Sequence, residues 1–120
     1  HKWEACNMGI NLKFHTDWMK DFSHYVADLL DAGIPALIYA GDLDFICNYL
    51  GNKAWTYKLE WSGSEEFKAA EEHEWKTGGM ARSAKGLTFM QVYDAGHMAP
   101  TDQPEVTLDM INTFLTGGQF

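Results

Sequence analysis

The sequence predicts an α/β fold, in which parallel-type strands are flanked by helices. Three observations point to it: a helical repeat of apolar residues over 16–33, an unbroken apolar run at 34–40, and a second β-rich run at 87–93. Helical segments stand before, between and after the two runs, which is the order typical of α/β domains. Two strands would leave open sheet edges on their own. Residues 1–120 are therefore expected to be an incomplete part of one larger domain, without an internal boundary.

The first helix is expected over residues 16–33, after an irregular stretch at 1–14. Thr16 can cap its start, and Gly33 and Pro35 end it, because glycine accepts the left-handed conformation and proline cannot continue a helix. Apolar residues recur at intervals of three and four, which indicates one buried face. That face would be formed by Trp18, Phe22, Tyr25, Val26, Leu29 and Leu30.

The middle of the chain contains both expected strands. The run IPALIYA at 34–40 is short and continuous, as in a strand buried on both faces of a parallel sheet. Short helices are expected at 52–59 and, in a strongly charged stretch, at 64–76. The glycine-bearing stretch 77–86 is predicted to be a flexible loop, and LTFMQVY at 87–93 the second strand.

The last helix is expected to begin at an acidic variant of the capping box, formed by Asp102 and Glu105. Gly117 and Gly118 would end it. Its apolar face would consist of Val106, Met110, Ile111, Phe114 and Leu115.

The composition limits the kinds of partner that the chain is expected to bind. It is 46% hydrophobic, which is enough for a core, and 9 basic against 17 acidic residues give a net charge of −8. Such a charge repels phosphate backbones, so we expect no nucleic-acid partner. No apolar run approaches the ~18 residues of a membrane span, so no membrane partner is expected either.

The cysteines are too few for a disulfide framework, and the histidines are scattered along the chain. Cys6 and Cys47 could pair with each other if their Cα atoms came within about 7 Å, or one could pair with a residue not present here. The histidines show no metal-ligand spacing with them, so no metal site is predicted. These histidines are His1, His15, His24, His73 and His97.

Two polar residues follow the two expected strands at matching distances. Asp44 lies four residues beyond Ala40, and His97 lies four residues beyond Tyr93. In open α/β sheets, sites form outside the carboxyl ends of the strands, so both loops can meet at one edge. A carboxylate beside one imidazole nitrogen fixes the tautomer and leaves the other nitrogen to accept a proton from a nucleophile.

Each of these residues also has a plain structural interpretation. Asp42 and Asp44 could cap the next helix or face solvent, and His97 could be a turn residue bonded to backbone. Cys47 alone is more often a small buried hydrophobe than a nucleophile, and Met98 alone indicates packing. The local sequence leaves these alternatives open.

Longer stretches narrow the interpretation. YAGDLDFICNYLGNKAW and YDAGHMAPTDQPE, with EACN and HTDWMKDF before them, closely resemble the serine carboxypeptidases of the α/β-hydrolase fold, most of all the vacuolar members of yeast and plants. The resemblance covers nearly the whole chain and is weakest over 62–86. It implies the C-terminal part of an α/β-hydrolase domain, and it implies no cofactor.

The resemblance assigns roles to the acidic loop and the histidine. The triad aspartate of the family is the second aspartate of GDxDxxCN, which is Asp44 here, and Asp42 is then a supporting residue. The triad histidine is that of GHMxP, which is His97.

The resemblance also implies roles for three other residues. Cys47 corresponds to a free cysteine that lines the substrate pocket, and Met98 to a pocket residue beside the catalytic histidine. Cys6 corresponds to a cysteine that forms a disulfide with one far upstream, outside this chain.

The nucleophile is missing. The α/β-hydrolases place their serine on a G-x-S-x-G elbow that precedes the acid and the histidine in the chain. None of the serines here has that context; they are Ser23, Ser62, Ser64 and Ser83. The serine is therefore expected in an upstream segment or chain of the same enzyme, and the isolated chain is predicted to be inactive.

The implied activity is release of C-terminal residues from peptides with a free terminal carboxylate, in a vacuole or lysosome or elsewhere along the secretory pathway. Two alternatives stay open. Relatives in the same family include acyltransferases and hydroxynitrile lyases, which reuse the triad on one fold. A truncated chain could instead be a non-catalytic binding module.

Overall fold

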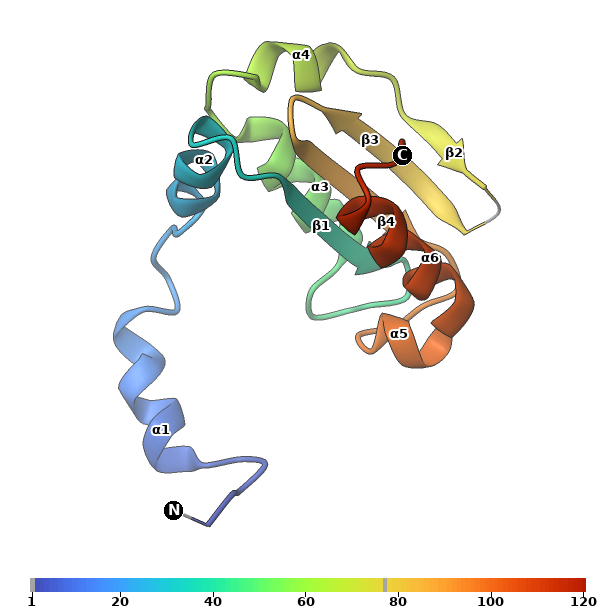
Figure 1. Ribbon diagram of the computed structural model, residues 1–120. Helices are drawn as coiled ribbons and strands as arrows, with labels where there is room; N and C mark the ends of the chain where they lie inside the picture. Colours follow the sequence, from blue (N-terminus) through green and yellow to red (C-terminus); the bar gives the residue numbers. More distant parts are fainter. Residues whose placement is uncertain (1, 77) are drawn as a thin grey trace.

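A computed structural model describes residues 2–76 and 78–120. It contains an open four-stranded sheet in the order β1-β4-β3-β2, covered by helices on both faces, and an N-terminal arm that extends away from it (Figure 1). The predicted α/β fold is confirmed.

The two strands expected from the apolar runs are the parallel pair of this sheet. β1 (Ala36–Gly41) lies beside β4 (Leu87–Val92) with Ala36 opposite Leu87 and Gly41 opposite Val92. Parallel strands need a long crossover, which the helices and strands of residues 42–86 provide. Because the pair is parallel, both strands end at the same edge of the sheet.

The expectation of a flexible loop at 77–86 is wrong, because most of this stretch forms β3 (Gly79–Ala84), antiparallel to β4. The glycine that indicated flexibility permits a close approach instead. A Cβ on Gly79 would lie 1.9 Å from the carbonyl oxygen of Gln91, so only glycine fits there. Thr77 lies outside the described residues.

The expected helix over 64–76 is also wrong beyond its first turns. α4 (Ser64–Ala69) ends where Ala70 turns to extended backbone, and β2 (His73–Trp75) then pairs with β3. Trp75 is only 5% exposed, since it packs in the core on the same side as Met110. Burial of this indole outweighs the helical preference of the charged residues around it.

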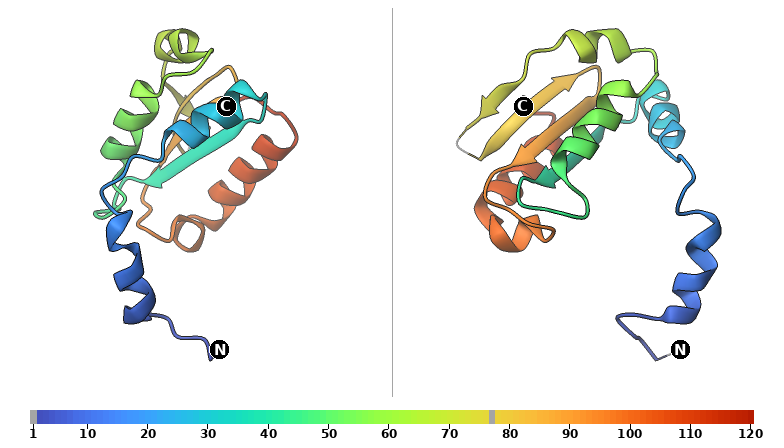
Figure 2. Two further views of the ribbon diagram at one scale, coloured as in Figure 1. Left: turned by 90° about the vertical axis from the view of Figure 1, so that its left-hand side faces the viewer. Right: turned by 180° about the vertical axis from the view of Figure 1, so that it is seen from behind.

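The N-terminal helix is shorter than its sequence pattern predicts. α2 (His24–Asp31) follows a separate arm that contains α1 (Met8–Lys13) and the 3-10 turn η1 (Phe14–Thr16). Figure 2 shows that this arm leaves the sheet and its helices. The apolar stripe continues along the arm, but only Val26, Ala27 and Leu30 meet the sheet, whereas Trp18 is 58% exposed. A periodic apolar stripe shows which side chains of a helix can be buried. They are buried only where another surface covers them.

The helices around the sheet begin at caps that differ from those expected. Asn48 caps the helix predicted at 52–59, since its side chain accepts a hydrogen bond from the Gly51 N–H at 2.8 Å. The expected capping box at Asp102 is wrong, because Asp102 accepts from the Gly96 N–H instead. The observed bounds are α3 (Tyr49–Lys58), α5 (Ala99–Asp102) and α6 (Pro104–Leu115).

Two apolar clusters lie on opposite faces of the sheet, and β4 contributes to both. Leu87 and Phe89 face α2, α3 and α4, whereas Met90 and Val92 face α6. Leu87, Met90 and Val92 are fully buried. Burial of a side chain of this size stabilises a fold by about 1.5–3 kcal/mol, so β4 is the principal anchor of both clusters.

The outer faces of α6 stay partly uncovered. Of its expected apolar face, Met110 is buried and Val106 packs against it, but Leu115 is 73% exposed. Among residues 2–76 and 78–120, no helix has the length and apolar character that crossing a membrane requires.

Candidate active site

Two loops meet at the edge where β1 and β4 end. Residues 42–48 connect β1 to α3, and residues 93–98 connect β4 to α5. Backbone hydrogen bonds join them: Asp42 N–H donates to the Val92 carbonyl at 3.0 Å, and Leu43 N–H donates to the Ala95 carbonyl at 2.9 Å. The loops therefore continue the pairing of the strands beyond the sheet.

Gly41 allows this close approach. A Cβ at this position would lie 2.0 Å from the carbonyl oxygen of Ala95, which is far below any real contact. Ala95 itself is fully buried. Asp94 adopts a left-handed backbone conformation with φ 52°, which asparagine and aspartate tolerate better than most residues. The tight turn brings the following His97 over the first loop.

Asp44 and His97 form a hydrogen-bonded pair at this edge. The Nδ1 atom of His97 lies 2.9 Å from Oδ2 of Asp44. The other carboxylate oxygen, Oδ1, accepts a hydrogen bond from the Cys47 backbone N–H at 3.0 Å. The Asp44 side chain is only 7% exposed, whereas that of His97 is 65% exposed. The turn at 44–47 thus fixes the carboxylate, and the carboxylate fixes the ring.

The electrostatics agree with an ionised aspartate. The hydrogen bond with His97, and after it the Cys47 N–H, hold the pKa of Asp44 below its ordinary value of 3.8. An ionised carboxylate at Nδ1 keeps the proton on that nitrogen. The Nε2 atom is then the free acceptor of the ring, so this arrangement can take a proton from a hydroxyl group placed beside it.

Cys47 and Met98 lie at the same edge. The Cys47 sulfur, an Asp44 carboxylate oxygen and a His97 ring nitrogen all lie within 4.8 Å of one another. Cys47 is exposed and so is not the buried hydrophobe of the alternative interpretation. Met98 follows His97 directly and is 63% exposed. Neither Asp42 nor Asp44 caps α3, since Asn48 does.

The sequence profile of the serine carboxypeptidase family matches residues 1–117, almost the entire chain. This chain belongs to the serine carboxypeptidase family. Known members share its sequence closely: it is 49% identical to carboxypeptidase Y of Candida albicans over 97% of its length, and 46% identical to carboxypeptidase Y of Komagataella phaffii over 96%. The chain spans about a fifth of the length of these relatives, 22% and 23%.

A solved structure shows the same arrangement of the backbone. Kex1(delta)p, a prohormone-processing carboxypeptidase from Saccharomyces cerevisiae, superimposes with a TM-score of 0.81 at 28% sequence identity. The match covers 96% of this chain and 26% of that protein. The sheet is therefore part of an α/β-hydrolase domain, as the sequence predicts, and this chain forms one portion of that fold.

The remaining residues of the predicted site are not all brought to the pair. Asp42 makes no hydrogen bond to His97, and its Oδ1 atom is buried without a hydrogen-bond partner among the described residues. Cys6 lies in the N-terminal arm, where it is exposed and unpaired with Cys47. Within residues 2–76 and 78–120, no serine hydroxyl is hydrogen-bonded to His97; that of Ser83 pairs with Thr88.

Several residues that support the pair are not evident from local sequence. Gly41 and Ala95 set the approach of the loops, and the Asp102 carboxylate holds the Gly96 N–H at 2.8 Å, which steadies the turn before His97. The Cys47 N–H that orients Asp44 is a backbone group. The glycines of the two motifs are the one signal for these supporting contacts in the sequence. Glycine often marks a position where two backbone segments approach closely.

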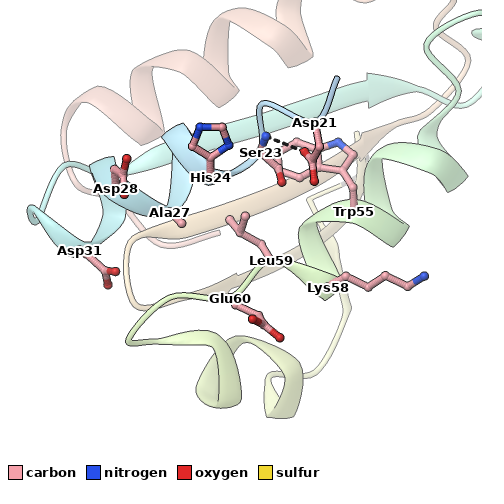
Figure 3. A pocket seen from close by; sticks show the side chains of 10 residues that line it. All are labelled: Asp21, Ser23, His24, Ala27, Asp28, Asp31, Trp55, Lys58, Leu59 and Glu60. Atoms are coloured by element: carbon pink, nitrogen blue, oxygen red, sulfur yellow. Dashed lines mark hydrogen bonds between the residues drawn. The ribbon is translucent and has the colours of Figure 1, made fainter. Parts of the chain in front are cut away.

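A cavity of about 620 Å³ lies elsewhere, between α2 and the end of α3 (Figure 3). Four acidic residues line it, and two of their carboxylates have local partners: Asp21 accepts from the Ser23 N–H and Asp31 from the Ser62 N–H. Neither Asp44 nor His97 lines it. These carboxylates hold the turn before α2 and the segment after α3, and the cavity is separate from the candidate active site.

Proposed function

We propose that the protein containing this chain is a serine-type carboxypeptidase, which releases C-terminal residues from peptides by acyl transfer. Membership of the serine carboxypeptidase family supports the class of reaction. The 2.9 Å contact between Asp44 and His97 is the observation that supports the mechanism, because it is the acid–base half of a Ser-His-Asp triad.

In this proposal, Asp44 orients His97 and stabilises the imidazolium that forms. The Nε2 atom takes the proton of a serine hydroxyl as that oxygen attacks the scissile carbonyl carbon. His97 then gives the proton to the leaving amine, and the peptide remains as a serine ester. Water attacks the ester in the second half, with its proton passing through His97 back to the serine oxygen.

The nucleophilic serine belongs to a part of the protein outside this chain. The exposed apolar residues beside the site support such a partner, since Phe45 is 92% and Ile46 83% exposed. β1 is the outermost strand of the described sheet, and an uncovered strand edge pairs readily with another strand. An upstream segment or chain of the same enzyme would cover these groups. Without it, the 120-residue chain is inactive.

The substrate is a peptide with a free C-terminal carboxylate. Cys47 and Met98 lie beside the Asp44–His97 pair and are exposed, so each can line a substrate pocket without taking part in proton transfer. Cys6 forms a disulfide with a residue outside the chain. The acid–base steps need no cofactor. Disulfide formation and the family likeness favour the secretory pathway, with a vacuole or lysosome as the working compartment.

The test compares a peptide and its amide. We expect the full-length protein to hydrolyse an N-blocked dipeptide with a free C-terminus and to leave the C-terminally amidated dipeptide nearly intact. His97→Ala should abolish turnover, whereas the matched control His73→Gln, at an exposed position of β2, should not change it. Equal hydrolysis of both substrates, or full activity of His97→Ala, would contradict the proposal. Acyl transfer to an alcohol with no hydrolysis would identify an acyltransferase instead.

A further inference from the structure

We propose that Asp44, Cys47 and His97 form a binding site for a borderline-soft divalent cation, best represented by Zn²⁺. The three side chains supply one oxygen, one sulfur and one nitrogen ligand, and these atoms lie within 4.8 Å of one another. The binding itself rests only on this cluster. Its consequence for activity rests on the proposed function, because two of the ligands are the proposed acid–base pair.

The spacing of the ligand atoms is close to that of a zinc site. Zinc bonds of about 2.0–2.3 Å at tetrahedral angles place neighbouring ligands about 3.4–3.6 Å apart. The Asp44–His97 contact is 2.9 Å, slightly closer than this, and the remaining separations extend to at most 4.8 Å. Side-chain rotations that move the ligand atoms by about an ångström close the difference between these separations and those of a zinc site. Both Cys47 and His97 are exposed, so they can make this adjustment without disturbing the core.

The local backbone fixes the positions of two of the ligands before the cation binds. Asp44 and Cys47 belong to one turn, which is closed by the Cys47 N–H donating to Asp44 Oδ1 at 3.0 Å. That bond occupies one carboxylate oxygen and leaves the other beside His97. Little ordering is therefore needed when the cation arrives, which favours binding. Solvent can fill the fourth position, because the His97 side chain is 65% exposed.

The donor set selects the type of cation. A thiolate sulfur together with an imidazole nitrogen favours Zn²⁺ and other thiophilic ions, whereas Mg²⁺ and Ca²⁺ require oxygen ligands. Only one of the three ligands is a carboxylate, so these hard cations should bind weakly. On coordination, the thiol releases its proton to solvent and the sulfur forms the metal bond, while His97 gives up its Nδ1 proton to bind through that nitrogen and carries its proton on Nε2 instead.

A bound cation would stop the proposed reaction. Its bonds to Asp44 and His97 replace the hydrogen bond that keeps the histidine tautomer in place. The ring can then no longer accept the serine proton in the required orientation. Zn²⁺ would thus be a reversible inhibitor that acts on the acid–base pair, with Cys47 supplying the selectivity for thiophilic ions.

Co²⁺ titration of the purified full-length protein tests the site without reference to activity. We expect one Co²⁺ per chain, with a sulfur-to-cobalt charge-transfer band, and displacement of Co²⁺ by Zn²⁺. Cys47→Ser should remove the band, and His97→Gln should weaken binding about tenfold or more, which is about 1.4 kcal/mol. His73→Gln is the matched control, since it removes an exposed histidine away from the cluster and should leave the band intact. Circular dichroism establishes that each variant is folded.

The outcomes separate the site from the proposed function. A band that persists in Cys47→Ser, or that His73→Gln abolishes, overturns the site and leaves the carboxypeptidase proposal standing. In the full-length enzyme, Zn²⁺ should inhibit and a chelator should restore activity. Binding to the full-length enzyme without inhibition overturns the inhibitory role, and with it the placement of Asp44 and His97 in the mechanism.

Discussion

His97 and Asp44 are 53 residues apart in the sequence, yet Nδ1 of His97 lies 2.9 Å from Oδ2 of Asp44. Their strands make this contact possible, because β1 and β4 are parallel neighbours and both loops leave the same edge. The Cys47 N–H holds the carboxylate from the other side. The pair is therefore a product of sheet topology and a tight turn, and both can be altered by mutation.

Asp44→Asn should lower kcat of the full-length enzyme by roughly 10⁴-fold, the loss that this change causes in the well-known Ser-His-Asp triad. The amide keeps the shape of the side chain but no longer fixes the productive tautomer of His97. KM should change little, because substrate binding is retained. Asp42→Asn is the matched control, since the hydrogen bond of His97 is made to Asp44 and not to Asp42. Comparable losses in both variants would contradict the assignment of Asp44.

Cys47→Ser should keep kcat within about tenfold of the wild type and change the preference among substrates, because the side chain borders the site without moving a proton. A bulky maleimide on Cys47 should inhibit by obstruction. The measurement is kcat and KM over one peptide series, with His97→Ala as the inactive reference. If Cys47→Ser is as inactive as His97→Ala, the thiol is a catalytic group.

The pKa of Asp44 should depend on His97. The hydrogen bond with His97 holds it below 3.8, so His97→Ala should raise it toward that value. A carboxyl group with a lowered pKa in the folded state contributes stability above its unfolded pKa, and this contribution is lost as pH falls through the folded pKa. The stability difference between wild type and His97→Ala should therefore shrink below about pH 4. NMR titration of the carboxyl carbon measures the shift directly, and an unchanged pKa would show that the pair is not coupled.

Gly41→Ala should destabilise the protein by about 1–3 kcal/mol, the usual cost of forcing extra atoms into a packed site. The new Cβ would lie 2.0 Å from the Ala95 carbonyl oxygen, so the two loops must separate. Activity should fall as well, since the loops position Asp44 and His97. Gly51→Ala is the control, because its Cβ meets only Asn48 at 3.4 Å and helix α3 prefers alanine. Urea unfolding of the two variants, compared with wild type, checks the difference.

The sequence predicted the parts of the fold whose signal is local. The unbroken apolar runs of β1 and β4 were identifiable because apolar clusters lie on both faces of the sheet, although Tyr39 of β1 is 39% exposed. β3 was not predicted, because a glycine such as Gly79 is compatible both with a flexible loop and with a tightly paired strand. β2 was not predicted because it is short and charged; its pairing with β3 and the burial of Trp75 hold it in the sheet.

The site, like the fold, could be predicted only where its signal is local in the sequence. The positions of Asp44 and His97 after two strands, together with the family motifs, indicated the pair. The orientation of the carboxylate by the Cys47 N–H and the loop contact at Gly41 could not be predicted, because both depend on atoms brought together by folding. The arm containing Trp18 shows the converse: its apolar pattern is clear, but the described residues provide no surface that covers it.

Labelling of the full-length protein with a serine-reactive fluorophosphonate tests the central claim most directly. We expect one label per molecule, on a serine outside residues 1–120, and a loss of labelling in His97→Ala, because the serine is activated only when Asp44 and His97 remove its proton. The isolated 120-residue chain should take up no label. A label on Ser23, Ser62, Ser64 or Ser83, or a labelling rate that His97→Ala does not change, would contradict the account.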